Sequence, residues 1–298
     1  TIDGKGTGKI TGIVINKTKD GYAGLFGQIG TKEVVSDSDK PVLGENNGTI
    51  IFGNAVTGQI KNICLEGKIN IEVEDKNLVT LDNKRVANIG FVCGELMQGA
   101  KLENVSVKLQ NSTVILKTSD QVNIGGVVGK NSGEIVSKVD FKQQENQSSS
   151  TKLLLPNICL LDMQNFEVKY QNTQAMNQSN PTNFGGIAGL NQGKIQKIFY
   201  QTTNLVGDDH FLAKTNMIVS RLVEDNFKIC MNVASVAGTN KGEISAYRYS
   251  NDTLETNGLD TQNYSDFIKT VGIIKIDEID ELILGGLVAE NDNGKLQY

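Results

Sequence analysis

Apolar and polar residues alternate along several stretches of the chain. Ile69, Ile71 and Val73 are separated by polar residues, and 105–109, 113–117 and 166–170 follow the same pattern. Successive side chains of a β-strand point to opposite faces, so a period of two predicts strands that each bury one face. The chain as a whole is therefore predicted to contain many strands joined by turns rich in glycine and asparagine.

One motif recurs between these strands. Its clearest copy spans Asn123–Ile135 and reads Asn-Ile-Gly-Gly-Val-Val-Gly-Lys-Asn-Ser-Gly-Glu-Ile, and it returns nearly intact at Asn183–Ile195. With the weaker matches included, copies of the motif lie near 22–30, 88–102, 123–135, 183–195, 234–244 and 283–296.

The residues of the motif predict how the chain turns. The Gly-Gly pair and the later Gly flank two apolar residues, which puts small residues where the backbone turns or approaches a neighbour closely. In the Asn-x-Gly-x-Ile half, Asn tolerates left-handed backbone and bonds its own turn, Gly accepts positive φ, and Ile points inward. One such coil cannot bury its apolar face alone, whereas stacked coils can. We therefore predict an all-β fold, a parallel β-helix (β-solenoid) that we expect to be right-handed.

The solenoid is predicted to occupy 1–298 as a single domain. The last small residues of successive copies are separated by uneven intervals, from 35 residues (Gly94 to Gly129) to 67 (Gly27 to Gly94). Each interval is interpreted as one or two short coils plus loops, and about ten coils would form a rod roughly 50 Å long at ~4.8 Å per coil. Because a repeat is under way at residue 1 and another is cut off at Tyr298, we expect a fragment of a longer chain.

Two regions leave the choice between helix and strand open. Apolar residues of 208–227 could line one face of a short helix, with Asp208 or Asp209 near its N-cap. Segment 276–284 fits a helix or a strand. The polar stretches 31–46, 143–151 and 171–182 are predicted to be exposed loops.

Charge and hydropathy exclude several classes of partner. The net charge of −5 is spread over positions of mixed sign without a block of like charges, which argues against binding to nucleic acid. No apolar run approaches the ~18 residues that span a bilayer, so no membrane span is expected. The first residues also lack the pattern of a signal peptide.

The four cysteines, Cys64, Cys93, Cys159 and Cys230, form no Cys-x-x-Cys pair. His210 is the only histidine, so a zinc site of the usual Cys/His kind lacks ligands. We expect free, half-buried thiols, with one or two disulfides as the alternative, and no metal or cofactor.

The repeats are similar to a known family. Residues 3–13 contain Asp-Gly-x-Gly and Ile-Thr-Gly-Ile, residues 22–27 read Tyr-Ala-Gly-Leu-Phe-Gly, and the remaining motif copies follow. This arrangement resembles the GLUG repeat. Proteins of that kind are bacterial surface proteins, adhesin-like proteins and the stalk regions of immunoglobulin A1 metalloproteases. The resemblance implies an extracellular or cell-surface location.

No catalytic constellation is apparent. Polysaccharide lyases and hydrolases built on β-helices need clustered carboxylates. The candidate acids share no register and lie in loops: Asp37, Asp39, Asp208, Asp209, Asp277 and Asp280. His210 has no nucleophile motif beside it, and no His-Glu-x-x-His sequence exists. We therefore predict no catalytic, cofactor-binding or metal-binding residue.

The expected function is that of a non-catalytic, surface-exposed structural or adhesive segment, which presents loops or spaces another module. One alternative is a polysaccharide-binding or polysaccharide-cleaving β-helix. Another is the stalk of a secreted protease whose catalytic domain lies outside this chain. Expected partners are a host or cell-surface protein or glycan, or neighbouring copies in an assembly. Functional residues are expected on the insertions between motif copies.

Overall fold

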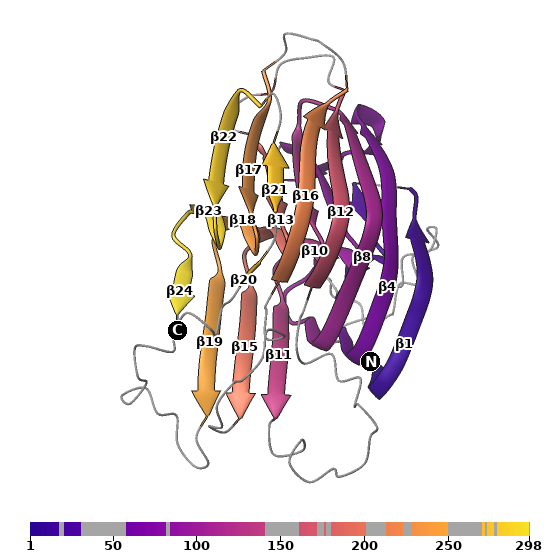
Figure 1. Cartoon of the computed structure of the whole chain (residues 1–298), viewed down its shortest axis with the longest axis vertical. Helices are drawn as coiled ribbons and strands as arrows, with labels where there is room; N and C mark the ends of the chain where they lie inside the picture. The colour runs from indigo at the N-terminus through magenta and orange to yellow at the C-terminus, as the bar shows by residue number, and fades with distance from the viewer. Residues whose placement is uncertain are drawn as a thin grey trace, which may run out of the picture.

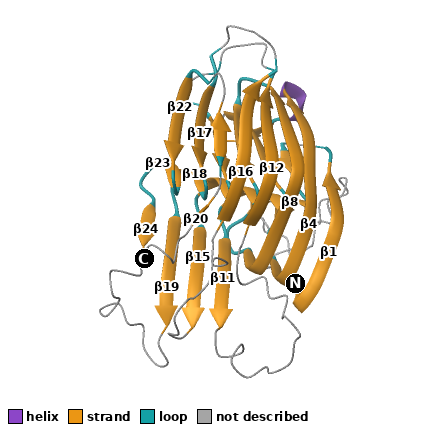
Figure 2. Cartoon of the chain, viewed as in Figure 1, coloured by secondary structure: helices purple, strands orange, loops and turns teal. Residues whose placement is uncertain are grey.

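The computed structural model describes residues 1–17, 21–30, 58–81, 84–140, 161–171, 176, 180–200, 213–222, 228–249, 270–271, 273–276 and 279–297. These residues form β-strands and one 3-10 turn, η1 (Asp75–Asn77), and none of them is in an α-helix (Figure 2). All strand pairs are parallel except β5 with β6. The stacked parallel sheets confirm the prediction of an all-β solenoid.

Three sheets form the walls of the solenoid (Figure 1). Sheet A consists of β1 (Ile2–Ile15), β4 (Gln59–Glu74), β8 (Lys101–Lys117), β11 (Glu134–Asp140), β12 (Leu161–Tyr170), β15 (Lys194–Tyr200), β16 (Ala213–Arg221), β19 (Glu243–Tyr249), β20 (Thr270–Val271), β21 (Ile274–Ile276) and β24 (Lys295–Gln297). Sheet B consists of β2 (Tyr22–Ala23), β5 (Val79–Leu81), β6 (Lys84–Gly90), β9 (Gln121–Gly125), β13 (Thr182–Gly185), β17 (Cys230–Ala234) and β22 (Glu281–Gly285). Sheet C consists of β3 (Phe26–Ile29), β7 (Cys93–Leu96), β10 (Val128–Asn131), β14 (Ala188–Asn191), β18 (Ala237–Asn240) and β23 (Val288–Asn291).

Each coil passes through sheets A, B and C in turn, and each contains one copy of the motif at the step from B to C. The strand register stacks the last small residue of every copy in one column of sheet C: Gly27, Gly94, Gly129, Gly189, Gly238 and Ala289. One coil per interval agrees with the lower limit of the predicted one or two, whereas the predicted total of about ten coils was wrong. Six coils at ~4.8 Å stack over roughly 30 Å, and the strands of sheet A run along the longest axis of the molecule (Figure 1).

Close approach of the backbone explains most of the motif glycines, and positive φ occurs at Gly30 and Gly99 of the first two copies. A Cβ added at Gly129 would lie 2.3 Å from the backbone nitrogen of Ile89 and 2.7 Å from the carbonyl oxygen of Gly94. At Gly133, where positive φ was predicted, φ is not positive, and a Cβ would instead lie 2.4 Å from the carbonyl oxygen of Ala100. The glycines thus let neighbouring backbones touch at the corners of each coil.

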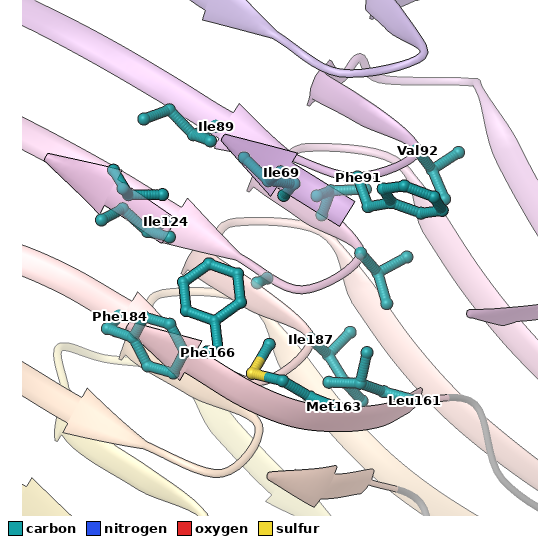
Figure 3. Close-up of a cluster of buried hydrophobic side chains, with 14 of the residues drawn as sticks. Ile69, Ile89, Phe91, Val92, Ile124, Leu161, Met163, Phe166, Phe184 and Ile187 are labelled. Atoms are coloured by element: carbon teal, nitrogen blue, oxygen red, sulfur yellow. The ribbon is translucent and has the colours of Figure 1, made fainter. Parts of the chain in front are cut away.

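The core fills the space between the sheets with columns of apolar side chains. Ile89, Ile124 and Phe184 stack in sheet B, and Phe166 of sheet A packs on Phe184 with ring centroids 5.6 Å apart (Figure 3). The alternation seen in the sequence is confirmed, because Ile69, Ile71 and Val73 are at most 3% exposed. Burial of these columns holds the coils together.

Asparagine amides join the coils at the corner between sheets C and A. Asn131 Nδ2 donates to Asn191 Oδ1 (2.7 Å), Asn191 Nδ2 to Asn240 Oδ1 (2.7 Å), and Asn240 Nδ2 to Asn291 Oδ1 (2.8 Å). Asn131 Oδ1 also accepts a hydrogen bond from the backbone of Gly133, so the predicted bond to its own turn is confirmed. None of these four asparagines is in the left-handed region.

Among the described residues, left-handed asparagines occur where the long strands of sheet A bend, and once more at Asn293 in the turn before β24. Asn62 and Asn104 have φ of 55° and 52°, and Asn104 Nδ2 donates to Asn62 Oδ1 at 3.2 Å. Asn111 and Asn165 repeat the arrangement with φ of 53° each and a 3.2 Å hydrogen bond. Asn tolerates this conformation better than most residues, so these bends explain part of the asparagine enrichment.

The structure resolves both ambiguous regions as strands where it describes them. Residues 213–221 form β16, in which Ala213, Thr215, Met217 and Val219 are buried alternately, so the helix interpretation of 208–227 was wrong there. The alternation of buried residues outweighed the helical spacing. Segment 276–284 contributes to β21 and β22, with 277–278 outside the described residues.

Three of the cysteines are described, and all three are free thiols. Cys93 and Cys230 are buried and Cys64 is half-buried, which agrees with the predicted free thiols. Cys159 lies outside the described residues. In the described part of the chain, no helix is long and apolar enough to cross a membrane.

Candidate functional site: the groove between sheets B and C

The outer faces of sheets B and C enclose a groove of about 690 Å³, which we call the corner groove. It extends along the stacking direction over the coils that contain β6 to β23. The sheet B side contains a column formed by Asn88, Asn123, Asn183, Asn232 and Ile283. The sheet C side contains Lys130, Leu190, Thr239 and Glu290 in register.

The asparagines of the groove form a second amide ladder. Asn232 Nδ2 donates to Asn183 Oδ1 (3.1 Å), Asn183 Nδ2 to Asn123 Oδ1 (2.8 Å), and Asn123 Nδ2 to Asn88 Oδ1 (2.7 Å). All four are at most 2% exposed. The amides therefore point the same way, each donating toward the N-terminal coil.

This polarity leaves the two ends of the ladder chemically different. At the C-terminal end, Asn232 Nδ2 also donates to the carboxylate of Glu290 at 2.9 Å, and Thr239 Oγ1 lies 3.3 Å from the same oxygen. At the N-terminal end, the buried Nδ2 of Asn88 has no hydrogen-bond partner among the described residues. The C-terminal end of the ladder therefore meets a carboxylate that accepts hydrogen bonds, whereas the N-terminal end keeps an amide donor without an acceptor among the described residues.

A buried carboxylate lies beside the N-terminal end. Glu95 is 6% exposed, accepts a hydrogen bond from Gln28 Nε2 (3.0 Å) and pairs with Lys130 Nζ (3.0 Å). The hydroxyl of Tyr22 also bonds this carboxylate, and burial together with Glu95 raises the pKa of Tyr22 well above its usual value. Glu95 is thus bonded to donors from both neighbouring coils.

The acidic residues at the C-terminal end are engaged as well. Asp292 pairs with Lys241 at 2.6 Å, and this partner lowers the pKa of the Asp292 carboxyl. Glu281 pairs with Lys228 and accepts a hydrogen bond from Cys230 Sγ at 3.3 Å. Burial, and then Glu281, raise the pKa of the Cys230 thiol to about 11. The thiol is therefore protonated at neutral pH.

The geometry of the corner groove favours binding through hydrogen bonds. Glu281, Glu290 and Asp292 are each occupied by donors of this chain. Within the described residues, no group of three or more His, Cys, Asp or Glu side chains could hold a metal ion. The groups that remain available are donors at the N-terminal end.

Of the acids singled out from the sequence, Asp280 lies within the described residues. Asp280 Oδ2 accepts hydrogen bonds from Arg221 Nη2 (2.9 Å) and from the backbone of Ile229 (2.7 Å), a role in fixing the start of β22. The other candidates lie outside the described residues: Asp37, Asp39, Asp208, Asp209, Asp277 and His210.

Sequence reasoning missed the corner groove. The sequence does contain an indication of the groove. An asparagine recurs two residues before the first small residue of the motif, at Asn88, Asn123, Asn183 and Asn232. A polar residue held at one register position between apolar neighbours indicates a ladder once the coils are known to stack.

Three segments between strands of sheet A share one position on the solenoid. Segments 141–160, 201–212 and 250–269 begin after β11, β15 and β19, whose last residues Asp140, Tyr200 and Tyr249 are in register. They end before Leu161, Ala213 and Thr270, which are also in register. The three segments therefore leave and rejoin neighbouring coils side by side, whereas β8 continues through this position by bending at Asn104.

No protein-family model, curated protein or solved structure matches the chain. The resemblance to GLUG repeats thus stays a prediction from the motif residues.

Proposed function

We propose that the chain is a non-catalytic β-solenoid, exposed at a cell surface or outside the cell, that presents a row of segments to a partner. The observation that carries this proposal is the common register at which 141–160, 201–212 and 250–269 leave sheet A. A rigid array of coils fixes the spacing of the strand ends from which adjacent segments leave at about 4.8 Å. A host or cell-surface protein or glycan that contacts neighbouring segments is the partner we propose.

The motif supports the surface location, because the repeats are similar to GLUG repeats of adhesin-like proteins. The same architecture would also serve as a stalk that spaces another module, such as a secreted protease domain. The two roles differ in one respect, since an adhesive segment binds a partner by itself and a spacer does not.

Binding by the isolated chain tests the proposal. The chain is applied to a glycan array and to immobilised extracellular-matrix proteins, alongside a variant in which the three segments of sheet A are replaced by short Gly/Ser linkers. The matched control replaces residues 31–57 instead. This segment connects β3 of sheet C with β4 of sheet A and so belongs to another position on the solenoid. We expect binding to a matrix protein or a neutral glycan that is lost in the three-segment variant and kept in the control.

Two outcomes would contradict the proposal. Binding to matrix proteins or to neutral glycans that survives replacement of all three segments would place the adhesive surface elsewhere on the solenoid. Turnover of pectin, alginate or glycosaminoglycans by the chain would make it an enzyme.

A further inference from the structure

The N-terminal end of the corner groove contains a donor that the protein itself does not use. Asn88 is fully buried and lines the groove, and its Nδ2 has no acceptor within the described residues. Its Oδ1 accepts the hydrogen bond from Asn123, so rotation of the amide would lose that bond and would not satisfy the Nδ2 donor. An unsatisfied buried donor is destabilising unless something supplies an acceptor.

The charges around this donor favour an anion. Lys84 lies on the same face of β6 as Asn88, lines the groove and has no ion pair among the described residues. Lys130 faces the same end and is paired with Glu95, whose charge it offsets. The groove's other acids, Glu281, Glu290 and Asp292, belong to the last coil, about 19 Å away at ~4.8 Å per coil. Among the described residues, one positive charge is therefore left over at the N-terminal end.

We propose that the N-terminal end of the corner groove binds the carboxylate of an acidic oligosaccharide. Asn88 Nδ2 and Lys84 Nζ donate to the carboxylate, and the sugar hydroxyls lie along the groove against Lys130, Gln121 and Asn123. The groove volume of about 690 Å³ falls within the ~300–1,000 Å³ usual for small-ligand sites.

A sugar fits this site better than an extended peptide. The central strands that line the groove are paired on both sides, for example β9 with β6 and β13, so the groove offers no free strand edge for a peptide backbone. Peptide recognition of that kind depends on such an edge. The lining is dominated by amides, amines and carboxylates, which suits a ligand rich in hydroxyl groups.

This inference goes beyond the proposed function, because the site is built from the solenoid itself. A variant that lacks the three segments of sheet A is expected to keep the acidic-sugar site. Failure of one proposal can therefore be distinguished from failure of the other.

Calorimetric titration of the full chain with trigalacturonate tests the inference. Maltotriose serves as the neutral comparison and an acetylated acidic tripeptide as the peptide comparison. Asn88→Asp keeps an oxygen acceptor for Asn123 and replaces the unused donor by a carboxylate, so we expect affinity to fall at least ten-fold. Lys84→Gln is expected to weaken binding several-fold, whereas Lys68→Gln, the same charge change outside the groove, should leave it unchanged.

Lys84 is exposed, so its variant reports on binding even if Asn88→Asp does not fold. The inference is supported if trigalacturonate binds, maltotriose binds at least ten-fold more weakly, and added NaCl weakens the acidic ligand only. It is overturned if trigalacturonate does not bind, if maltotriose or the peptide binds equally well, or if Lys84→Gln and folded Asn88→Asp both bind as the parent chain does. The last result would indicate that Asn88 merely holds a buried water.

Discussion

Gly129→Ala should destabilise this chain although it adds a single methyl group. The new Cβ would lie 2.3 Å from the nitrogen of Ile89, 2.6 Å from the carbonyl carbon of Asn88 and 2.7 Å from the oxygen of Gly94. All three neighbours are backbone atoms of strands that are hydrogen-bonded on both sides. No side chain can rotate away, so sheets B and C must separate.

The size of that separation sets the expected effect. Moving a 2.3 Å contact to a normal carbon–nitrogen distance opens the corner by about 1 Å, and a gap of 0.5–1 Å forfeits a quarter to a half of the dispersion energy of each contact across it. For one buried side chain with ~40–60 contacts of ~0.1–0.2 kcal/mol, the loss is on the order of 2–4 kcal/mol. Overpacked cores typically lose ~1–3 kcal/mol, so we expect at least about 2 kcal/mol.

Urea unfolding followed by circular dichroism measures the effect, with Gly286→Ala as the matched control. A Cβ at Gly286 meets no atom within 4 Å, and its φ is not in the left-handed region. The control should change stability by less than ~0.5 kcal/mol. If Gly129→Ala is no more destabilising than Gly286→Ala, close approach of the two sheets is not the reason for the motif glycines.

Three further predictions follow from the ladders and the buried thiols. Asn191→Ala should lower the free energy of unfolding by about 1–3 kcal/mol, because Asn131 Nδ2 loses its acceptor and Asn240 Oδ1 a donor; an equal loss for Gln192→Ala, an exposed neighbour, would contradict this. Stability should be full below the pKa of an unfolded thiol, ~8.5, and fall as pH rises toward 11, because burial raises the pKa of Cys230 to about 11 and the unfolded chain ionises first; a urea midpoint that stays constant from pH 7 to 11 would refute it. Iodoacetamide at pH 8 should modify Cys64 before Cys93 and Cys230, as mass spectrometry of peptides would show, and the reverse order would contradict their burial.

The sequence allowed the architecture to be predicted because each coil repeats the same physical requirements. Alternation at Ile69, Ile71 and Val73 identified a buried face, and the recurring glycines identified stacked corners. The number of coils could not be predicted, because the length of a coil depends on whether sheet A continues, as in β8, or is interrupted, as between β11 and β12. Nothing in the local pattern fixes that choice.

The region 208–227, where the sequence left the choice between helix and strand open, shows how tertiary context decides between two spacings. The apolar residues of 213–219 fit both the helical and the strand period. A strand forms because β16 pairs with β12, and this pairing buries every second residue. The corner groove was missed for a related reason. Its asparagines are far apart in sequence and become one surface only when the register of the coils is known.

The central claim is that each motif copy corresponds to one coil and that the coils stack in register. Spin labels introduced through unnatural amino acids at Gln28 and Glu290, five coil steps apart in one column of sheet C, test it directly by pulsed electron paramagnetic resonance. One coil per copy predicts a narrow distance distribution near 24 Å at ~4.8 Å per step. A distribution centred near 48 Å, as two coils per copy would give at ~4.8 Å per step, or a broad one, would contradict the account.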